Sequence, residues 1–279
     1  MEKLYGLIGW PVSHSMSPAI HNHAFSELNI SGHYHAFPVS PQGLEKAVAG
    51  LRALGISGFN VTIPHKVAIL PYLDELDLSA ELAGAVNTVK NSGGRLIGYN
   101  TDGQGYLQSL KEKAGELQGK NILLIGAGGA ARAIFYTLSH AGCRSIDVCN
   151  RTIEKAAELI QLNPAGTFGR PLAIQEAEDI LSKYDVIIQT TSIGMKPHAG
   201  KSPIRLYNAK KTCIVSDIIY NPITTELLKQ AEEKGLKTVN GVGMFVNQAA
   251  LSFEIWTDRI PDKKGMERIV LDNLGGTTC

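Results

Sequence analysis

The segment NILLIGAGGAARAIFYTLSHAG, residues 121–142, constrains the fold of this chain more than any other. An apolar run is expected to form a strand that leads directly into a glycine-rich turn, and a helix is expected to continue as far as His140. In such a unit Gly126 can make the tight turn, Gly128 can let the backbone approach a pyrophosphate, and Ala131 is the third small residue needed for close helix packing. The helix N-terminus then favours negative charge. The segment therefore predicts a dinucleotide site rather than an ordinary glycine-rich turn.

The next strand, in SIDVCNRT, indicates which dinucleotide is preferred. A site that prefers NAD usually ends this strand with Asp or Glu, which accepts hydrogen bonds from the ribose hydroxyls. This chain has Asn150 there, followed by Arg151. Arg151, with the Thr152 hydroxyl and Lys155 one helical turn on, can bind a 2′-phosphate that a carboxylate would repel. NADP is therefore favoured; the alternative is that Arg151 and Lys155 are only the solvated start of a helix.

Short apolar runs alternate with amphipathic segments along the chain, which predicts α/β architecture with mostly parallel sheets. Strands are expected in KLYGLIG, HYHAFPV, GFNVTIP, NILLIG, SIDVCN, DVIIQTT and CIVSDII, and helices in LEKAVAGLRALG and TTELLKQAEEKG. Around Gly93 and Gly94 the pattern indicates a hairpin. We expect a domain junction near residue 103 and helices from about Gly241 to the end of the chain.

Length and charge limit the domain number and the function classes. At 279 residues the chain is long enough for two domains. We expect one over 1–103, a second over 104–240, and C-terminal helices over 241–279 that pack back on the first. The 27 lysines and arginines against 26 acids create no overall field that would gather nucleic acid or an anionic membrane. Any anion must therefore be bound by a local site.

Metal binding, secretion and membrane insertion are not indicated. The histidine pairs His21/His23 and His33/His35 lack nearby cysteines or a clear acidic partner. The cysteines show neither CxxC spacing nor a histidine at metal-ligand spacing; they are Cys143, Cys149, Cys213 and Cys279. No basic leader precedes a long apolar core, and no run approaches the roughly 20 apolar residues of a membrane span. The sequence predicts a soluble cytoplasmic protein with reduced thiols and no metal.

Polar residues stand where several N-terminal elements are expected to end. In HSMSPAIHNHAF, Pro18 suits the first helical position and Ser17 the N-cap, with Ser15 as a loop hydroxyl. The capping role is the preferred interpretation on local sequence; the two hydroxyls beside a helix N-terminus can also form a carboxylate site, and local spacing does not decide between them. Further polar residues follow apolar runs, the usual place for ligand groups in an open α/β sheet: Thr62, Lys66, Asn87 and Asp102. Singly, each is better explained as a turn or capping residue.

Eight motifs, taken together and in order, point to a known family. They are HSMSP, NVTIPHK, GAVNT, NTDG, GAGGAAR, NRT, DIIYNPITT and GVGMFVNQAA. From about Leu4 to Phe253 the chain resembles the shikimate dehydrogenase family, and the ordered set is far more specific than any one motif. The resemblance implies an N-terminal substrate domain with a mostly parallel sheet and a Rossmann-like NADP-binding domain, separated by a cleft that holds the substrate.

The resemblance also implies an activity and a set of site residues. Members reduce 3-dehydroshikimate to shikimate with NADPH, a step toward chorismate and the aromatic amino acids. The residues assigned to the substrate are Ser15, Ser17 and Tyr220 at the carboxylate, and Thr62, Asn87, Asp102 and Gln248 at the ring hydroxyls. Those assigned to the cofactor are Gly126, Ala127, Gly128, Gly129 and Ala130 at the pyrophosphate, Asn150, Arg151, Thr152 and Lys155 at the adenosine end, and Ile218 with Gly241 beside the nicotinamide.

Lys66 is the residue that we expect to act on the substrate carbonyl. Reduction places a hydride on carbon and a proton on oxygen, so a group must stabilise or protonate the oxyanion as it forms. An ammonium directed at the carbonyl favours the transition state over the ground state, and Asp102 can orient it. The sequence leaves open whether Lys66 transfers the proton or only polarises the carbonyl.

Two positions depart from the family pattern. Lys155 stands where many members have arginine, and offers a point charge in place of a bidentate fork, which weakens the case for strict NADP preference. Leu78 stands where an acid is expected in many relatives, so no cofactor contact is assigned to it.

The alternative enzyme is a quinate/shikimate dehydrogenase that accepts NAD. The alternative of another class is a catalytically silent dinucleotide-binding regulator, which the presence of both Lys66 and Asp102 disfavours. A monomer and a homodimer both remain open.

Overall fold

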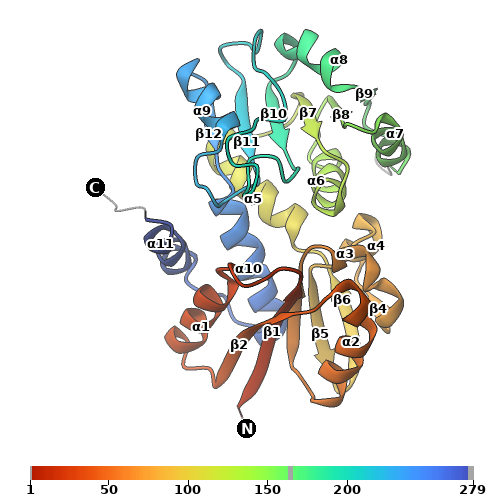
Figure 1. Cartoon of the computed structure of the whole chain (residues 1–279), viewed down its shortest axis with the longest axis vertical. Helices are drawn as coiled ribbons and strands as arrows, with labels where there is room; N and C mark the ends of the chain where they lie inside the picture. The colour runs from red at the N-terminus through yellow and green to blue at the C-terminus, as the bar shows by residue number, and fades with distance from the viewer. Residues whose placement is uncertain (1, 163–165, 276–279) are drawn as a thin grey trace. The chain divides into compact units, whose positions relative to one another are not determined.

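The computed structural model describes residues 2–162 and 166–275, and the chain divides into two compact units (Figure 1). The first unit contains the residues up to Asp102 together with those from Val246 onward, and the second contains Gly103–Phe245. Within the described residues each unit has one six-stranded sheet. The α/β class predicted from the alternating pattern is confirmed.

The sheet of the first unit has the strand order β2-β1-β3-β5-β6-β4. Its strands are β1 (Lys3–Gly9), β2 (Gly32–Pro38), β3 (Gly58–Val61), β4 (Glu75–Leu76), β5 (Thr88–Ser92) and β6 (Arg95–Tyr99). Among these described strands only β5 runs against the others. β5 and β6 form the hairpin expected from the sequence. Gly93 and Gly94 between them have φ values of +62° and +96°, a backbone conformation that residues with a side chain rarely adopt.

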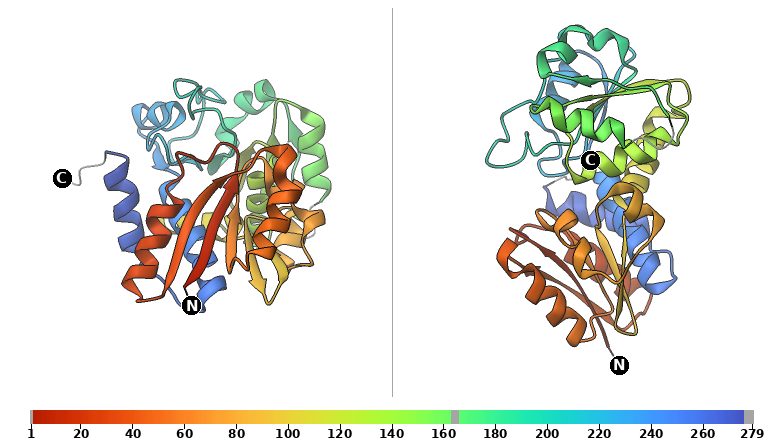
Figure 2. Two further views of the ribbon diagram at one scale, coloured as in Figure 1. Left: turned by 60° about the horizontal axis from the view of Figure 1, so that its bottom comes forward. Right: turned by 90° about the vertical axis from the view of Figure 1, so that its right-hand side faces the viewer.

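Helices cover both faces of this sheet. They are α1 (Ser17–Glu27), α2 (Leu44–Ala53), α3 (His65–Ala68), α4 (Leu78–Ala83), α10 (Val242–Thr257) and α11 (Lys263–Asn273). On one face α2 packs through Val48 and Leu51. On the other, Phe25 of α1 packs with Phe253 and Trp256 of α10. α11 lies against α1 (Figure 2, left). The C-terminal segment therefore completes the core of the first unit.

The sheet of the second unit is parallel throughout, in the order β12-β11-β10-β7-β8-β9. Its strands are β7 (Asn121–Ile125), β8 (Ser145–Cys149), β9 (Pro171–Leu172), β10 (Val186–Gln189), β11 (Ile214–Asp217) and β12 (Lys237–Val239). The remaining helices are α5 (Asp102–Ala114), α6 (Gly129–Ser139), α7 (Ile153–Gln161), α8 (Ile174–Asp179) and α9 (Glu226–Glu233). Counted from β7, this is the 3-2-1-4-5-6 order of dinucleotide-binding folds, with the reversal between β7 and β10.

Both faces of the second sheet are buried, which explains the continuous apolar run of β7. Ile122 and Leu124 of β7 enter the core under α6 and α7, whereas Leu123 and Ile125 enter the core under α8 and α9. Successive strand residues point to opposite faces, so in a strand covered on both sides apolar residues can follow one another, as they do in β7.

The start of α1 differs from the sequence prediction. Ser17 is not the N-cap: the helix begins at Ser17, Met16 occupies the N-cap position, and no side chain caps it there. Instead the Ser15 hydroxyl accepts a hydrogen bond from the Ser17 backbone N–H, at 3.3 Å. The capping interpretation of Ser17 is therefore wrong.

The described residues include no membrane-spanning helix and no cluster of metal ligands, and three of the cysteines are buried free thiols. Among the described helices, none is long and apolar enough to cross a membrane. The described residues contain no group of three His, Cys, Asp or Glu side chains that could hold a metal ion. Burial raises the pKa of the Cys149 and Cys213 thiols to about 12 and that of Cys143 to about 11. These three thiols are free, and Cys279 lies outside the described residues.

Candidate active site

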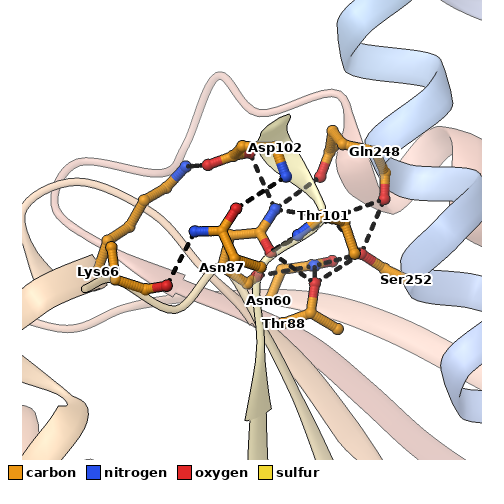
Figure 3. Close-up of polar contacts among 10 residues, drawn as sticks. Asn60, Lys66, Asn87, Thr88, Thr101, Asp102, Gln248 and Ser252 are labelled. Atoms are coloured by element: carbon orange, nitrogen blue, oxygen red, sulfur yellow. Dashed lines mark hydrogen bonds and ion pairs between the residues drawn. The ribbon is translucent and has the colours of Figure 1, made fainter. Parts of the chain in front are cut away.

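Lys66 and Asp102 form an ion pair in the first unit (Figure 3). β3 ends at Val61, and Lys66 is the second residue of α3, held in place because its carbonyl accepts the Val86 N–H at 2.8 Å. The Lys66 Nζ lies 2.5 Å from Asp102 Oδ2. Asp102 begins α5, and its backbone N–H donates to Asn100 Oδ1 at 3.0 Å. The ammonium and the carboxylate are therefore both held by elements of the fold.

Asn87, just before β5, binds the other oxygen of the same carboxylate. Its Nδ2 donates to Asp102 Oδ1 at 2.9 Å and to Thr101 Oγ1 at 2.8 Å. Its Oδ1 accepts the Thr101 backbone N–H at 2.8 Å. Because a backbone N–H can only donate, the Asn87 amide can have only this orientation. Asp102 thus accepts one donor at each oxygen.

Gln248, on α10, reaches the same group of residues. Its Oε1 lies 3.4 Å from Asn87 Nδ2, and its backbone carbonyl accepts from Thr101 Oγ1 at 3.0 Å and from Ser252 Oγ at 2.9 Å. Of the substrate residues expected from the sequence, the structure brings four together in one hydrogen-bonded set: Lys66, Asn87, Asp102 and Gln248.

A second layer of buried polar residues, which is not predicted from the sequence, supports this set. Asn60 Nδ2 donates to the Asn87 carbonyl at 3.0 Å and to Thr88 Oγ1 and Ser252 Oγ at 3.1 Å. Thr88 and Ser252 hydroxyls lie 2.7 Å apart, and Tyr34 OH donates to Asn60 Oδ1 at 2.8 Å. The sequence does contain one indication of this layer, which is Asn60 within the apolar strand GFNV. An asparagine buried in such a strand almost always has hydrogen-bond partners.

The two serines lie at the start of α1. Ser15 Oγ and Ser17 Oγ are 3.2 Å apart. Burial raises the pKa of Tyr34, and a hydrogen bond with the Ser17 side chain partly opposes this rise. Since Tyr34 also binds Asn60, Ser17 is linked through two residues to Asn87.

Thr62 follows β3 and is half buried. Its carbonyl accepts the His65 N–H at 2.9 Å, which closes the turn that leads to Lys66. The structure describes no hydrogen bond that would join the Thr62 side chain to the set around Asp102. Its role as a substrate ligand stays a prediction.

The glycine-rich turn lies in the second unit, at the point where the strand order reverses. Gly126 follows β7 with φ +113°, and a methyl group there would lie 2.5 Å from Thr190 Oγ1, beyond the end of β10. The side chain is excluded because two adjacent strand ends meet at this point. Gly126 therefore has a structural reason to be glycine.

Gly128 is different, because a methyl group on it would meet nothing within 4 Å. It is exposed, and it is the N-cap of α6, which begins at Gly129. Ala127 packs partly on the core and Ala131 is fully buried in it; Ala130 is half buried. Open space in front of a helix N-terminus suits the approach of a phosphate group.

The residues after β8 form an exposed basic turn. Asn150 Nδ2 donates to the Thr152 carbonyl at 2.8 Å, which folds the turn, and Thr152 is the N-cap of α7 without using its side chain for the cap. Arg151, Thr152 and Lys155 are all exposed. Here the structure places a guanidinium, a hydroxyl and an ammonium on one turn, with no acid at the strand end.

Ile218 and Gly241 lie against each other in the second unit. A methyl group at Gly241 would overlap the Ile218 carbonyl, and the Gly241 N–H donates to the Ile219 carbonyl at 3.0 Å. Asp217 anchors this loop, since its Oδ1 accepts the Ile219 N–H at 2.9 Å. Burial raises the pKa of this carboxyl to about 6.

Tyr220 stacks on Phe245 at 4.3 Å between ring centroids. Its assignment to the substrate carboxylate stays a prediction.

Sequence profiles of three families match the chain. The profile described as the shikimate dehydrogenase substrate binding domain matches residues 7–89. The shikimate / quinate 5-dehydrogenase profile matches residues 108–222, and the shikimate 5′-dehydrogenase C-terminal domain profile matches residues 241–271.

Curated relatives and solved structures agree with these matches. NADP(+) shikimate dehydrogenases from Bacillus licheniformis and Bacillus subtilis are 57% and 53% identical, each over 100% of both chains. A crystal structure of a shikimate dehydrogenase in complex with NADP+ matches with a TM-score of 0.91 and 42% identity, over 98% of this chain and 96% of that one. The shikimate 5-dehydrogenase of Listeria monocytogenes, in complex with shikimate and NAD, matches with a TM-score of 0.88 and 38% identity over 96% of each chain.

Proposed function

Because the chain belongs to the shikimate dehydrogenase family, we propose that it catalyses the reversible reduction of 3-dehydroshikimate to shikimate with NADPH. This makes it an oxidoreductase of the shikimate pathway, which leads to chorismate and the aromatic amino acids. The observation that carries the proposal is the Lys66–Asp102 pair, held at 2.5 Å by a buried polar network. A chain that only bound a dinucleotide would have no use for an ammonium fixed in this way.

Lys66 is proposed to act on the carbonyl oxygen of the substrate. Its side chain is 19% exposed and that of Asp102 is 5% exposed, so the ammonium is the accessible member of the pair. When bound, NADPH supplies the hydride. Lys66 stabilises the negative charge that develops on oxygen, and a lysine in this position can also deliver the proton. Asp102 holds the ammonium in place with one oxygen while Asn87 occupies the other.

The substrate ring is proposed to bind in the first unit. Asn87, Asp102 and Gln248 would contact its hydroxyls, supported by their mutual hydrogen bonds. Thr62 would join them from the end of β3. Ser15 and Ser17 would bind the carboxylate, and the 3.2 Å between their hydroxyl oxygens suits two donors to one anionic group.

The cofactor is proposed to bind in the second unit, whose residues fit it. Gly126–Ala130 would hold the pyrophosphate, supported by the open space at Gly128 and by the start of α6. Asn150, Arg151, Thr152 and Lys155 would hold the adenosine end and its 2′-phosphate, which the absence of an acid at Asn150 favours. Ile218 and Gly241 would border the nicotinamide. The functional domains are then 1–103 for substrate and 104–240 for NADP, followed by the C-terminal helices, of which the part from Val246 onward belongs to the first unit.

We further propose a cytoplasmic location, with a monomer or a homodimer as the working state. The reaction uses a soluble acid and a soluble nicotinamide cofactor, which are both supplied in the cytoplasm.

A spectrophotometric assay tests the proposed function. Consumption of NADPH is followed by the loss of absorbance of the reduced nicotinamide, with 3-dehydroshikimate as substrate. Turnover is expected with a kcat/KM in the range typical of enzymes, about 10⁴–10⁸ M⁻¹ s⁻¹. Absence of turnover with folded protein and fresh substrate would reject the activity.

A quinate/shikimate dehydrogenase that accepts NAD is the second candidate. It is favoured by Lys155, which binds a phosphate as a point charge and not as a fork. Measuring kcat/KM for shikimate and quinate, each with NADP and NAD, separates the two. The first proposal predicts the highest value for shikimate with NADP, and a higher value with quinate or NAD would select the second.

A further inference from the structure

Thr101 contacts the Asn87 side chain at two points. Its backbone N–H donates to Asn87 Oδ1 and its hydroxyl oxygen accepts from Asn87 Nδ2, both at 2.8 Å. The two bonds close a ring that fixes the amide plane and leaves one Nδ2 hydrogen for Asp102 Oδ1. With this amide reversed, a carbonyl oxygen would face the Asp102 carboxylate, and two acceptors would repel each other.

The Thr101 hydroxyl also has a partner on α10. Its hydrogen has three acceptors within reach, and the Gln248 carbonyl is the nearest at 3.0 Å; Asn87 Oδ1 and Ser252 Oγ are each at 3.3 Å. One hydroxyl therefore connects Asn87 with the helix turn that carries the Gln248 side chain (Figure 3). Thr101 is 4% exposed, so water does not compete for these bonds.

We propose that Thr101 is a positioning residue: its hydroxyl holds Asn87 and the Gln248 backbone in the arrangement that presents Asp102 to Lys66. This inference rests on the proposed function, in which Asn87 and Gln248 bind the substrate ring. Thr101 is not proposed to touch the substrate, because its hydroxyl is fully occupied by Asn87 and Gln248. Its effect passes through the Asn87 side chain and through the Gln248 backbone.

Two substitutions at Thr101 separate the hydroxyl from the shape of the side chain. Thr101→Val keeps the shape and the backbone N–H but removes the hydroxyl, whereas Thr101→Ser keeps the hydroxyl and removes a methyl group. We expect Thr101→Val to lower kcat/KM for 3-dehydroshikimate by about 5- to 20-fold, because one Asn87 hydrogen and one Gln248 acceptor lose a buried partner. Thr101→Ser should stay within about threefold of the unmodified enzyme, and the KM for NADPH should not change.

Thr257 provides the matched control. It lies on α10, and its hydroxyl donates to the Phe253 carbonyl at 2.8 Å, outside the set around Asp102. Thr257→Val removes the same atom from the same unit and should leave kcat/KM unchanged. Equal loss in Thr101→Val and Thr257→Val, or equal loss in Thr101→Val and Thr101→Ser, would overturn the proposal.

A second measurement does not depend on the substrate. In protein labelled with ¹⁵N at asparagine, hydrogen exchange of the Asn87 side-chain amide is followed by NMR in the unmodified protein and in both Thr101 variants. We expect exchange at least about tenfold faster in Thr101→Val and near-normal in Thr101→Ser. Unchanged exchange in Thr101→Val overturns the positioning role, and so does loss of protection in Thr101→Ser. If the unmodified enzyme fails to reduce 3-dehydroshikimate, the proposed function fails while this measurement still decides the role of Thr101.

Discussion

Lys66 and Asp102 are buried to different degrees although their charged atoms are in contact. The Lys66 side chain is 19% exposed and the Asp102 side chain 5%, with Nζ and Oδ2 2.5 Å apart. A charge that must meet a substrate has to be reachable, whereas the charge that holds it does not. The more buried carboxylate has its second oxygen occupied by Asn87, so it can orient the lysine without rotating.

Lys66→Met should lower kcat by about 10²- to 10⁴-fold, the range for a positioned acid–base group. The KM for 3-dehydroshikimate should change much less, because the residues proposed to bind the ring remain. Steady-state kinetics check this. Lys90→Met is the control, since Lys90 also faces an aspartate, Asp258, at 3.9 Å but lies outside the site. An unchanged kcat in Lys66→Met would remove the lysine from the chemistry.

Gly126 and Gly128 should respond differently to alanine. Gly126→Ala introduces a side chain at φ +113° and against Thr190, so we expect a clear fall in Tm. Gly128 has φ −82°, and a methyl group there would meet nothing within 4 Å. The Tm of Gly128→Ala should therefore stay within roughly a degree or two of the unmodified protein, as for a surface substitution. Its Kd for NADPH should nevertheless rise, because the methyl group fills the space proposed for the pyrophosphate.

Calorimetric titration and thermal melts of both variants test this difference. Gly50→Ala is the control, since Gly50 lies inside α2 of the other unit and a methyl group there also meets nothing within 4 Å. It should keep full NADPH affinity and gain slightly in stability, as alanine does in a helix interior. If Gly128→Ala binds NADPH normally, the pyrophosphate does not approach this residue.

Arg151→Ala should weaken NADPH selectively. A charge-assisted hydrogen bond contributes about 1.5–3 kcal/mol, so we expect kcat/KM with NADPH to fall by roughly 10- to 100-fold. The value with NADH should change little, because NADH has no 2′-phosphate. Arg144 is the control: it is exposed and lies just before β8, at the opposite end of the strand. Equal losses with both cofactors in Arg151→Ala would contradict a 2′-phosphate contact.

His21 should make the fold sensitive to acid. Its ring is fully buried and stacks on Tyr34 at 4.5 Å between centroids, and neither ring nitrogen has a hydrogen-bond partner in the described structure. Burial lowers its pKa from 6.5 to about 3. The unfolded chain therefore binds a proton that the folded chain excludes, and between about pH 6.5 and about pH 4 His21 should reduce the free energy of unfolding by about 3 kcal/mol.

Urea unfolding of His21→Phe across this pH range measures the effect. The variant keeps an aromatic ring against Tyr34 and removes the titrating group, so its free energy of unfolding should fall less steeply toward acid. His33→Phe is the control because His33 is exposed on β2. Identical slopes for the unmodified protein and His21→Phe would show that His21 is not excluded from protonation in the folded state.

The parts of the fold that were predictable are those with a repeating pattern. β7 and β10 were predictable because strands buried on both faces read as nearly continuous apolar runs. β8 and β11 were predictable from a majority of apolar residues, although they contain the buried polar residues Asp147 and Ser216. β4, β9 and β12 were missed because they are only two or three residues long, too short for any period to show. The N-cap of α1 lies one residue before the predicted one, at Met16, whose side chain is not a typical cap, so no local pattern in the sequence marks it.

The candidate site also has a predictable and an unpredictable part. The polar and charged residues at the ends of elements could be predicted from motifs, and the family resemblance assigned their roles. The supporting layer could not be found because its members have no local pattern: Asn60 and Ser252 are 192 residues apart, and only the return of α10 brings them into contact. A buried hydroxyl in a helix is indistinguishable in sequence from one that simply bonds to its own backbone.

The division of the chain has a consequence for its synthesis. The first unit is interrupted after Asp102 and resumes at Val246, so the second unit is an insertion within it. Tyr5 and Phe25 cannot complete their core until Phe253 and Trp256 have been made. The dinucleotide unit is a single uninterrupted stretch, and it is fully translated before Phe253 and Trp256 are. The first unit is therefore begun first and completed last, because α10, which brings Gln248 to Asn87 and Thr101, is translated near the end of the chain.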